Sequence, residues 1–329
     1  MMRAWLIDAA DGGQSLRIVE RAKPVCSGSD VLVRITAAGI VPLDGAIIRG
    51  ENEATFPPAA FPLTPGNQGA GVVEDPGSSS FAVGQRVMFG AFPYGFMRDG
   101  SWAEYVAVDA SHLAAMPDAL SDGAAAQAVV AYPTAYFALK EAGMAQGKTV
   151  LATGIGGSVG NAAYQLAKAM GASMVISTAG STDKAQKAAE KGFDNVIDLS
   201  EEAISDGVRR LTNGAGVDIV IDSLGGQVLA DALQALARYG RVISLGFSAG
   251  RQSTITLADL ILVRGSVQGY GAYTNPPEEW QEAWSYVEEL IQKGVIAPIF
   301  DKSFPFENAV EGLRYLKEGR PFGAVALAI

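Results

Sequence analysis

The stretch Val150-Leu-Ala-Thr-Gly-Ile-Gly-Gly-Ser-Val-Gly160 decides the fold, and it runs directly into Asn161-Ala-Ala-Tyr-Gln-Leu-Ala-Lys-Ala-Met-Gly171. A short run of β-favouring and small residues ends in a glycine cluster, which opens into an alanine-rich helical segment closed by Gly171. This order predicts a strand, a phosphate-binding turn and a helix. The N-terminus of such a helix offers backbone N–H groups and the positive end of its dipole to an anion.

Each glycine of the cluster has a physical role in this prediction. Gly154 permits the tight turn, Gly157 lets backbone amides approach a pyrophosphate, and Gly160 allows the helix to pack closely on the strand. The residues that we expect to hold the pyrophosphate are Gly154, Gly157, Ser158, Val159 and Gly160.

Further short apolar segments follow the glycine cluster and alternate with helical stretches. The expected strands are Met174–Thr178, Val196–Asp198, Val217–Asp222 and Arg241–Gly246. Strands that alternate with helices in this way indicate βαβ units on a parallel sheet. The region 123–269 is therefore predicted to be a doubly wound α/β domain that binds a dinucleotide.

The rest of the chain has a different character. Residues 1 to about 120 are rich in strands and turns, with expected strands at Asp30–Ala37, Gly69–Glu74 and Gln85–Phe89, which favours an antiparallel, barrel-like domain. Beyond residue 269 the pattern predicts helices over Pro277–Lys293 and Phe306–Leu316 and a last strand from Ala324 to Ile329. We expect residues 1–122 and 270–329 to form one catalytic domain into which the cofactor domain is inserted.

Composition limits the classes of partner. The 329 residues are 49% hydrophobic and 18% charged, and the net charge of −10 argues against nucleic acid or an anionic membrane as the main partner. We find neither a targeting segment nor a run of eighteen apolar residues, so we expect a cytoplasmic protein. The single cysteine, Cys26, excludes an internal disulfide and a multi-cysteine zinc site.

The end of the second expected strand indicates which dinucleotide is used. An NAD site usually has an acidic residue there to bind the ribose 2′-hydroxyl, but this chain reads Ile176-Ser-Thr-Ala-Gly-Ser-Thr-Asp-Lys184. Asp183 faces away if the next helix begins near Thr182. The sequence therefore favours NADPH over NADH, although Lys184 is alternatively a solvated helix residue. The groups that could bind a 2′-phosphate are Ser177, Thr178, Ser181 and Lys184.

The order of motifs resembles the medium-chain dehydrogenase/reductase superfamily, and specifically its zinc-independent quinone oxidoreductase branch. The resemblance covers nearly the whole chain and implies a Rossmann-type doubly wound parallel sheet inserted in a GroES-like β-barrel catalytic domain. The segments that carry it are Ala37–Asp44, Pro65–Val73, Val83–Val87, Gly100–Val106, Pro133–Tyr136, the glycine cluster, Val217–Gly225 and Gly240–Gly246.

The resemblance also implies site residues. Asp44 matches the aspartate near the active-site segment of the family and is expected, with Tyr132 and Tyr270, to be a catalytic residue. Cofactor contacts are implied for Thr134, Ser223, Gly246, Phe247 and Phe322. Zinc-bearing relatives have a ligand cysteine where this chain has Val41 and a His-Glu pair where it has Asn67-Gln68, so no metal is expected. The single histidine, His112, is interpreted as an exposed residue at a strand edge rather than a catalytic group.

Hydride transfer remains as the expected chemistry. The cofactor supplies the reactive carbon, and a conjugated acceptor spreads the developing charge onto its own oxygen. Many quinone oxidoreductases have asparagine and tyrosine where this chain has Val41 and Ala46. The loop Phe89–Arg98 is interpreted either as an apolar wall for a planar acceptor or as a loop that packs its own aromatic side chains on the barrel. The candidate proton donors are Tyr132, Tyr270 and Tyr273.

The sequence thus predicts an NADPH-dependent, zinc-independent quinone reductase. Two alternatives stay open: reduction of 2-alkenals, enones or enoyl thioesters, and a catalytically silent sensor that binds NADPH. We further predict a homodimer, because the strand-rich stretch Ile261–Gly269 would leave an apolar sheet edge exposed and family members commonly pair this edge across a twofold axis.

Overall fold

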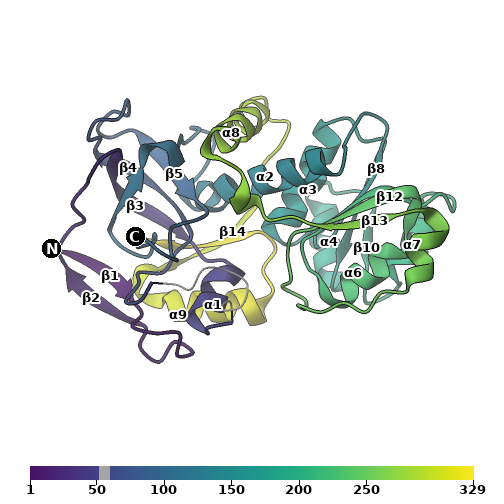
Figure 1. Ribbon diagram of the computed structural model, residues 1–329, viewed down its shortest axis with the longest axis horizontal. Coiled ribbons are helices and arrows are strands. Elements are labelled where there is room, and N and C mark those ends of the chain that lie inside the picture. The colour runs from purple at the N-terminus through teal and green to yellow at the C-terminus, as the bar shows by residue number, and fades with distance from the viewer. Residues whose placement is uncertain (52–59) are drawn as a thin grey trace. The chain divides into compact units, whose positions relative to one another are not determined.

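The computed structural model describes residues 1–51 and 60–329, which form two compact units. The first unit comprises residues 1–130, 276–288 and 298–329, and the second comprises residues 131–275 and 289–297. Two long helices, α2 (Asp122–Glu141) and α8 (Pro277–Gln292), are each divided between the units. Figure 1 shows both units and labels those elements for which there is room.

The first unit is mainly antiparallel β-structure. Its seven-stranded sheet has the order β14-β15-β3-β4-β5-β7, with β6 paired to β3, and β1 and β2 form a separate hairpin. All pairs are antiparallel except β14 with β15. Its elements are β1 (Met2–Leu6), β2 (Arg17–Arg21), β3 (Asp30–Gly39), α1 (Pro42–Ile48), β4 (Gln68–Asp75), β5 (Arg86–Gly90), β6 (Tyr105–Asp109), β7 (Leu113–Ala115), β14 (Phe300–Pro305), α9 (Ala309–Arg314) and β15 (Ala324–Ala328).

Alternating apolar residues of these strands form the core of the first unit. In β3 the side chains of Val31, Val33 and Ile35 are buried, as a strand with one face on the core requires. Two buried tryptophans satisfy their indole N–H groups with backbone carbonyls: Trp5 donates to Phe306 at 2.8 Å and Trp102 to Gly39 at 3.1 Å. The predicted antiparallel domain is confirmed.

The second unit contains a six-stranded parallel sheet. Its strand order is β10-β9-β8-β11-β12-β13. From β8 the chain adds β9 and β10 on one side; it then returns to the other side of β8, where it adds β11, β12 and β13. This is a doubly wound sheet, which confirms the predicted fold class. Its elements are β8 (Thr149–Ala152), α3 (Ser158–Ala169), β9 (Met174–Ala179), α4 (Thr182–Glu190), β10 (Val196–Asp198), α5 (Ile204–Leu211), β11 (Val217–Asp222), α6 (Gly226–Leu233), β12 (Leu236–Ser244), α7 (Leu257–Val263) and β13 (Ser266–Gly269).

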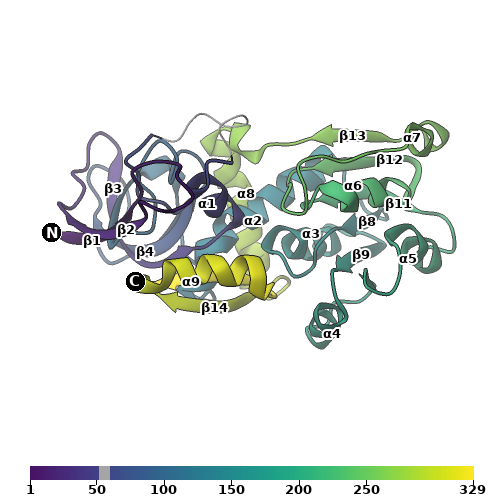
Figure 2. The ribbon, with the colours of Figure 1, turned by 90° about the horizontal axis from the view of Figure 1, so that it is seen from below.

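The glycine cluster joins β8 to α3. Gly154 has φ of +78°, which a residue with a side chain rarely adopts. A Cβ atom on Gly160 would lie 2.3 Å from the carbonyl oxygens of both Thr153 and Gly154. Only a residue without a side chain lets the helix come this close to the end of the strand. Figure 2 shows α3 next to β8 and β9.

The prediction of a strand over Ile261–Gly269 is wrong in its first part. Residues up to Val263 belong to α7, which ends where Arg264 adopts a left-handed conformation, and only Ser266–Gly269 form a strand. Leu260 and Val263, three residues apart, pack on the core of the second unit, whereas Ile261 and Leu262 are exposed. The two residues between Leu260 and Val263 are also apolar, so the sequence shows no clear helical period and the helix could not be distinguished from a strand.

The strand β13 nevertheless lies at one edge of the parallel sheet. It pairs with β12 on one side, and its four residues are exposed. Leu257, Ile261 and Leu262 of the preceding helix α7 are also strongly exposed apolar side chains.

No helix in the described parts of the chain has the length and hydropathy needed to cross a membrane.

We predict that Gly160→Ala destabilises the protein by about 1–3 kcal/mol, because the added methyl group overlaps two carbonyl oxygens that belong to the turn. The matched control is Gly180→Ala, since a Cβ at Gly180 meets nothing within 4 Å and the φ of this residue lies outside the left-handed region. Denaturant unfolding of both variants provides the measurement. Equal stability of the two variants would show that α3 does not depend on this close approach.

Candidate functional site

Several predicted residues meet at the carboxyl edge of the parallel sheet. In a doubly wound sheet, ligands bind outside the carboxyl ends of the strands where the strand order reverses, here between β8 and β11. The N–H of Gly154 donates to the hydroxyl of Thr178 at 2.9 Å. The hydroxyl of Ser223 donates to the carbonyl of Thr153 at 3.1 Å. The glycine turn is thereby tied to the ends of β9 and β11.

The N-terminus of α3 has room for a phosphate group. The first intrahelical bond runs from the N–H of Asn161 to the carbonyl of Gly157 at 3.0 Å, so the N–H groups of Val159 and Gly160 precede it. Gly157 is exposed, and a Cβ on it would have its nearest contact 3.5 Å away. Ser158 occupies the first helical position. A dinucleotide pyrophosphate fits this arrangement of donors and open space.

The end of β9 has the chemistry of a 2′-phosphate site. Ser181 caps α4, with its hydroxyl 3.4 Å from the N–H of Lys184, and Lys184 lies in the first turn of that helix, partly buried. The carboxylate of Asp183 forms an exposed ion pair with Lys187 at 2.9 Å. The carboxylate of Asp183 therefore pairs with a residue of its own helix, which begins at Thr182 as the sequence analysis assumed.

Two of the predicted 2′-phosphate ligands have internal roles instead. Ser177 is completely buried and donates to the carbonyl of Ala152 on the neighbouring strand at 2.5 Å, so its side chain cannot reach a ligand. Thr178 is also buried and accepts the N–H of Gly154. We therefore withdraw Ser177 from the ligand set and assign Thr178 to support of the glycine turn.

The segment after β12 packs against the segment after β11. A Cβ on Gly246 would lie 2.2 Å from the carbonyl oxygen of Ser223, so this position requires glycine. The next side chain, Phe247, is 40% exposed, and the guanidinium carbon of Arg251 lies 5.0 Å from its ring centre. Phe247 is thus an exposed apolar surface at the carboxyl edge of the sheet.

The three tyrosine candidates differ in environment. Tyr132 is buried on α2 and its hydroxyl accepts from Nε2 of Gln165 at 2.9 Å; burial raises its pKa, which keeps the hydroxyl protonated. Tyr270 follows β13, is partly buried, and donates to Oδ1 of Asn275 at 2.5 Å. Tyr273 is half exposed. Thr134, also on α2, is buried.

In the first unit, Asp44 joins two chain segments. It is buried at the start of α1, and its carboxylate accepts the N–H of Val41 at 2.8 Å and the N–H of Asn67 at 3.1 Å. Burial raises the pKa of Asp44 to about 7, against the opposing effect of the backbone N–H donors. A carboxylate occupied by backbone donors positions these segments rather than touching a substrate. Phe322, the last predicted contact, is buried beside Gly323.

The loop Phe89–Arg98 packs part of its aromatic content on the core of the first unit, as one of the two interpretations from the sequence expected. Tyr94 is fully buried; its hydroxyl accepts the N–H of Asp109 at 2.9 Å and lies 3.1 Å from Nδ1 of His112. Phe92 and Met97 remain exposed. His112 is accordingly half-buried against Tyr94, which corrects the expectation of an exposed residue, and this burial lowers its pKa.

Asn67 directly precedes β4. It is buried, and its Nδ2 donates to the carbonyl of Tyr94 at 3.2 Å. Throughout residues 1–51 and 60–329, no three His, Cys, Asp or Glu side chains are grouped as a metal ion would require.

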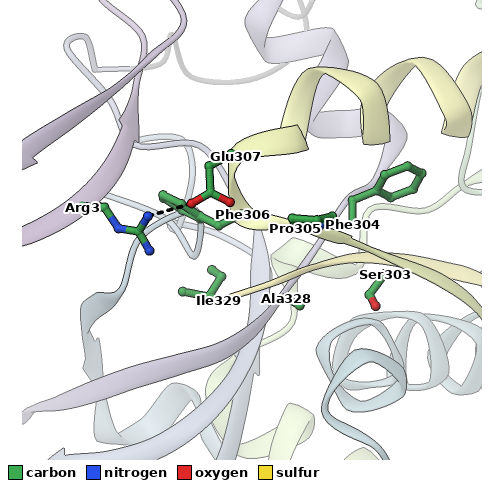
Figure 3. A pocket seen from close by; sticks show the side chains of 8 residues that line it. All are labelled: Arg3, Ser303, Phe304, Pro305, Phe306, Glu307, Ala328 and Ile329. Atoms are coloured by element: carbon green, nitrogen blue, oxygen red, sulfur yellow. Dashed lines mark hydrogen bonds and ion pairs between the residues drawn. The ribbon is translucent and has the colours of Figure 1, made fainter.

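Two cavities of the first unit lie in other places. One of about 510 Å³ opens on the first unit between Arg3 and the strands β14 and β15, and a second of about 430 Å³ is lined in part by Phe81 and Gln281. In Figure 3 the charged residues of the first cavity, Arg3 and Glu307, form an ion pair with each other at 2.7 Å. None of the predicted site residues lines either cavity.

Asp222, Thr153 and Ser244 were absent from the predicted site. They lie at the carboxyl ends of β11, β8 and β12, and the hydroxyls of Thr153 and Ser244 both donate to the buried carboxylate of Asp222. Their signal in the sequence was a polar residue that ends or directly follows a buried strand.

Two family models and a known protein match this chain. Residues 27–118 match the family described as the alcohol dehydrogenase GroES-like domain, and residues 158–289 match the zinc-binding dehydrogenase family. The chain is 30% identical to quinone oxidoreductase-like protein 2 of Rattus norvegicus, over 99% of this chain and 96% of that protein.

Two solved structures share the fold over essentially the full length of both chains. An alcohol dehydrogenase superfamily protein from Novosphingobium aromaticivorans has a TM-score of 0.89 at 30% identity, with complete coverage of both chains. Escherichia coli quinone oxidoreductase, solved in complex with NADPH, has a TM-score of 0.86 at 27% identity and covers 99% of this chain and 100% of its own.

We predict that Asp44 makes stability fall as the pH rises from about 4 to about 7. Below 3.8, the ordinary pKa of the group, both the folded and the unfolded chain hold the proton. Between this value and about 7 only the folded chain holds it, so the free energy of unfolding decreases by up to about 1.4 kcal/mol per pH unit. Above about 7 this dependence ends.

The measurement is the free energy of unfolding as a function of pH for wild type and Asp44→Asn. The variant is expected to lose the slope, and Asp118→Asn, which changes an exposed carboxylate, is expected to retain it. A variant Asp44→Asn with an unchanged slope would contradict the assignment.

Proposed function

The chain belongs to the medium-chain dehydrogenase/reductase superfamily of oxidoreductases, and on that premise we propose that it transfers hydride from NADPH to a quinone without zinc. We propose the cofactor domain as residues 123–269 and the substrate domain as residues 1–122 and 270–329. The observation that carries the choice of cofactor is the segment after β9, where Ser181 and Lys184 stand and the carboxylate of Asp183 is paired with Lys187.

The described residues suit both charged groups of NADPH, the pyrophosphate and the 2′-phosphate. The N-terminal turn of α3 would hold the pyrophosphate, and Lys184 with Ser181 would hold the 2′-phosphate. The related Escherichia coli quinone oxidoreductase was solved with NADPH, which supports the same choice here.

Zinc independence is supported by the two segments that Asp44 joins. Where zinc-bearing relatives have ligands, this chain has Val41, which has no donor atom, and Asn67, whose Nδ2 already donates to Tyr94. The acceptor must then stabilise its own developing charge, and a conjugated quinone does so by delocalising it onto oxygen.

The mechanism assigns limited tasks to the protein. Bound NADPH supplies the hydride. The glycine turn and the 2′-phosphate site would hold the cofactor, and Gly246 and Phe247 are proposed to contact its nicotinamide half. The reduced acceptor then takes up one proton, for which Tyr132 and Tyr270 are the candidate donors; the partly buried Tyr270 at the carboxyl edge of the sheet is the better placed.

The first test is oxidation of NADPH by a small quinone, measured beside a medium-chain enal, an enone and an enoyl thioester, with reduction of NADP⁺ by primary alcohols as the contrast. We expect turnover of the quinone and negligible oxidation of alcohols, both unchanged by chelator. Turnover of enals alone would replace the quinone with the alternative substrate class. Chelator-sensitive alcohol oxidation, or binding of NADPH with no turnover at all, would contradict the proposal.

Lys184→Ala should weaken binding of NADPH by about 1–3 kcal/mol and leave binding of NADH little changed, because only NADPH has a phosphate for the ammonium group to bind. Lys187→Ala, one turn further along α4 and paired with Asp183, is the matched control and should affect neither cofactor. Fluorescence titrations give both dissociation constants. Equal weakening of the two cofactors would place the 2′-phosphate elsewhere.

We also propose a homodimer formed through the exposed edge strand β13 and the apolar surface of α7. Light scattering at micromolar concentration should give twice the chain mass of 34.2 kDa. Val267→Lys, on the edge strand, is expected to reduce this mass, whereas Val295→Lys, at an exposed position after α8, is not. A wild-type chain that is monomeric would end this proposal.

A further inference from the structure

Asp222 is a fully buried carboxylate at the carboxyl end of β11, and the proposed chemistry gives it no direct role. Burial of a charged group is costly unless hydrogen bonds compensate for the lost water. The same strand carries a second carboxylate, Asp218, near its other end, which is about one-third exposed and binds Lys148 and the N–H of Thr149. The two acidic residues of β11 thus have distinct environments.

Four donors converge on the carboxylate of Asp222. Its Oδ1 accepts the N–H groups of Leu224 and Gly225, both at 3.1 Å, and its Oδ2 lies 3.2 Å from the same Gly225 N–H. The hydroxyl of Ser244 donates to Oδ2 at 2.9 Å, and the hydroxyl of Thr153 donates to Oδ1 at 3.3 Å. These donors come from the ends of three neighbouring parallel strands.

The loop held by Asp222 supports the segment after β12. Gly225 has φ of +68°, and a Cβ on it would lie 3.1 Å from Cα of Phe247. The N–H of Ala249 donates to the carbonyl of Leu224 at 2.8 Å, and Gly225 pairs with Gly250 in an isolated β-bridge. The position of Phe247 therefore depends on the loop that Asp222 fixes.

The same cluster reaches the glycine turn. The hydroxyl of Thr153, the residue before Gly154, accepts the N–H of Ser223 at 3.2 Å while it donates to Asp222. The hydroxyl of Ser223 returns a bond to the carbonyl of Thr153 at 3.1 Å. One buried carboxylate thus connects the pyrophosphate turn to the surface expected at the nicotinamide.

We propose that Asp222 is the positioning residue of the cofactor site: through Thr153, Ser244 and the N–H groups of residues 224 and 225, it holds the loops 153–160, 223–226 and 246–250 in the arrangement that binds NADPH. The identity of the bound molecule rests on the proposed function, whereas the locking of the loops does not. Asp222 touches neither cofactor nor substrate and acts through the loops.

The carboxylate of Asp222 presents both of its oxygen atoms as acceptors to this donor set. Two of the donors are backbone N–H groups, which cannot turn around to accept. In Asp222→Asn one oxygen becomes an NH₂ group that would face the N–H of Gly225, although the hydroxyl of Ser244 can rotate and accept from it. In Asp222→Ala the two backbone N–H groups and the hydroxyl of Ser244 lose this acceptor, while the hydroxyl of Thr153 keeps the carbonyl of Ile221 at 3.5 Å. The two variants are therefore expected to show graded effects.

The first arm of the test measures the dissociation constant of NADPH by fluorescence titration. We expect Asp222→Ala to raise it roughly tenfold or more and Asp222→Asn to raise it less, in keeping with buried donors left without an acceptor. Asp218→Asn and Asp218→Ala, at the opposite end of the same strand, should leave it unchanged. Reversible unfolding raises the apparent dissociation constant by the inverse of the folded fraction, so the folded fraction of each variant is measured by circular dichroism and the constant is corrected for it. The proposal requires the increase to remain after this correction.

The second arm uses hydrogen exchange of the protein without cofactor. Asp222→Ala should speed exchange of the amides in residues 223–226 and 246–250, whereas Asp218→Ala should not. Unchanged exchange in these loops would overturn the proposal whatever the cofactor, and an unchanged dissociation constant with faster exchange would overturn the link to NADPH. A wild-type protein that fails to bind NADPH would overturn the proposed function, while the exchange arm still decides the role of Asp222.

Discussion

The close approach of α3 to the end of β8 is the constraint on which the second unit depends. Gly160 leaves no room for a Cβ against the carbonyls of Thr153 and Gly154, and this contact sets both the entry angle of the helix and the position of its N-terminal amides. A phosphate site made of backbone groups cannot be adjusted by a side chain, so its quality depends on how rigidly the chain around it is held.

The polar contacts at the carboxyl edge of the sheet provide that rigidity. Thr178 holds the N–H of Gly154 from one side, and Ser223 and Thr153 exchange two hydrogen bonds on the other. All of these side chains are short, and several are buried, because an edge formed by strand ends and glycine turns has space only for small polar groups. The longer side chains, such as Phe247 and Lys184, lie at the outer margin of the same edge.

The first unit uses a comparable device for a different purpose. A single buried carboxylate, Asp44, accepts the backbone N–H groups of Val41 and Asn67. Both units therefore use a buried aspartate to fix segments far apart in sequence. Asp44 does so through backbone N–H groups, and Asp222 through the hydroxyls of Thr153 and Ser244. At such a position the surrounding donors require a side chain that accepts several hydrogen bonds, whether or not that side chain takes part in the reaction.

Three sets of residues differ from what their sequence suggested. The identity of Ser177 suggested a phosphate ligand, but strand pairing turns it toward the carbonyl of Ala152 inside the sheet. The apolar run that begins at Ile261 suggested a strand, but the packing of Leu260 and Val263 on the core made its first part helical. His112 gave no signal of its contact with Tyr94, which lies 18 residues earlier in the chain.

The sequence by itself determined the doubly wound sheet, the antiparallel unit, the glycine turn and the lack of an acidic residue at the end of β9. These features depend on local patterns: the spacing of glycines, the period of apolar residues and the residue that follows a strand. Only the tertiary structure decided which polar groups converge, because Asp222, Thr153 and Ser244 are far apart in the chain and meet solely through the order of parallel strands. Sequence patterns specify the elements, whereas the burial and hydrogen bonding of a side chain depend on neighbours that only the packed sheet provides.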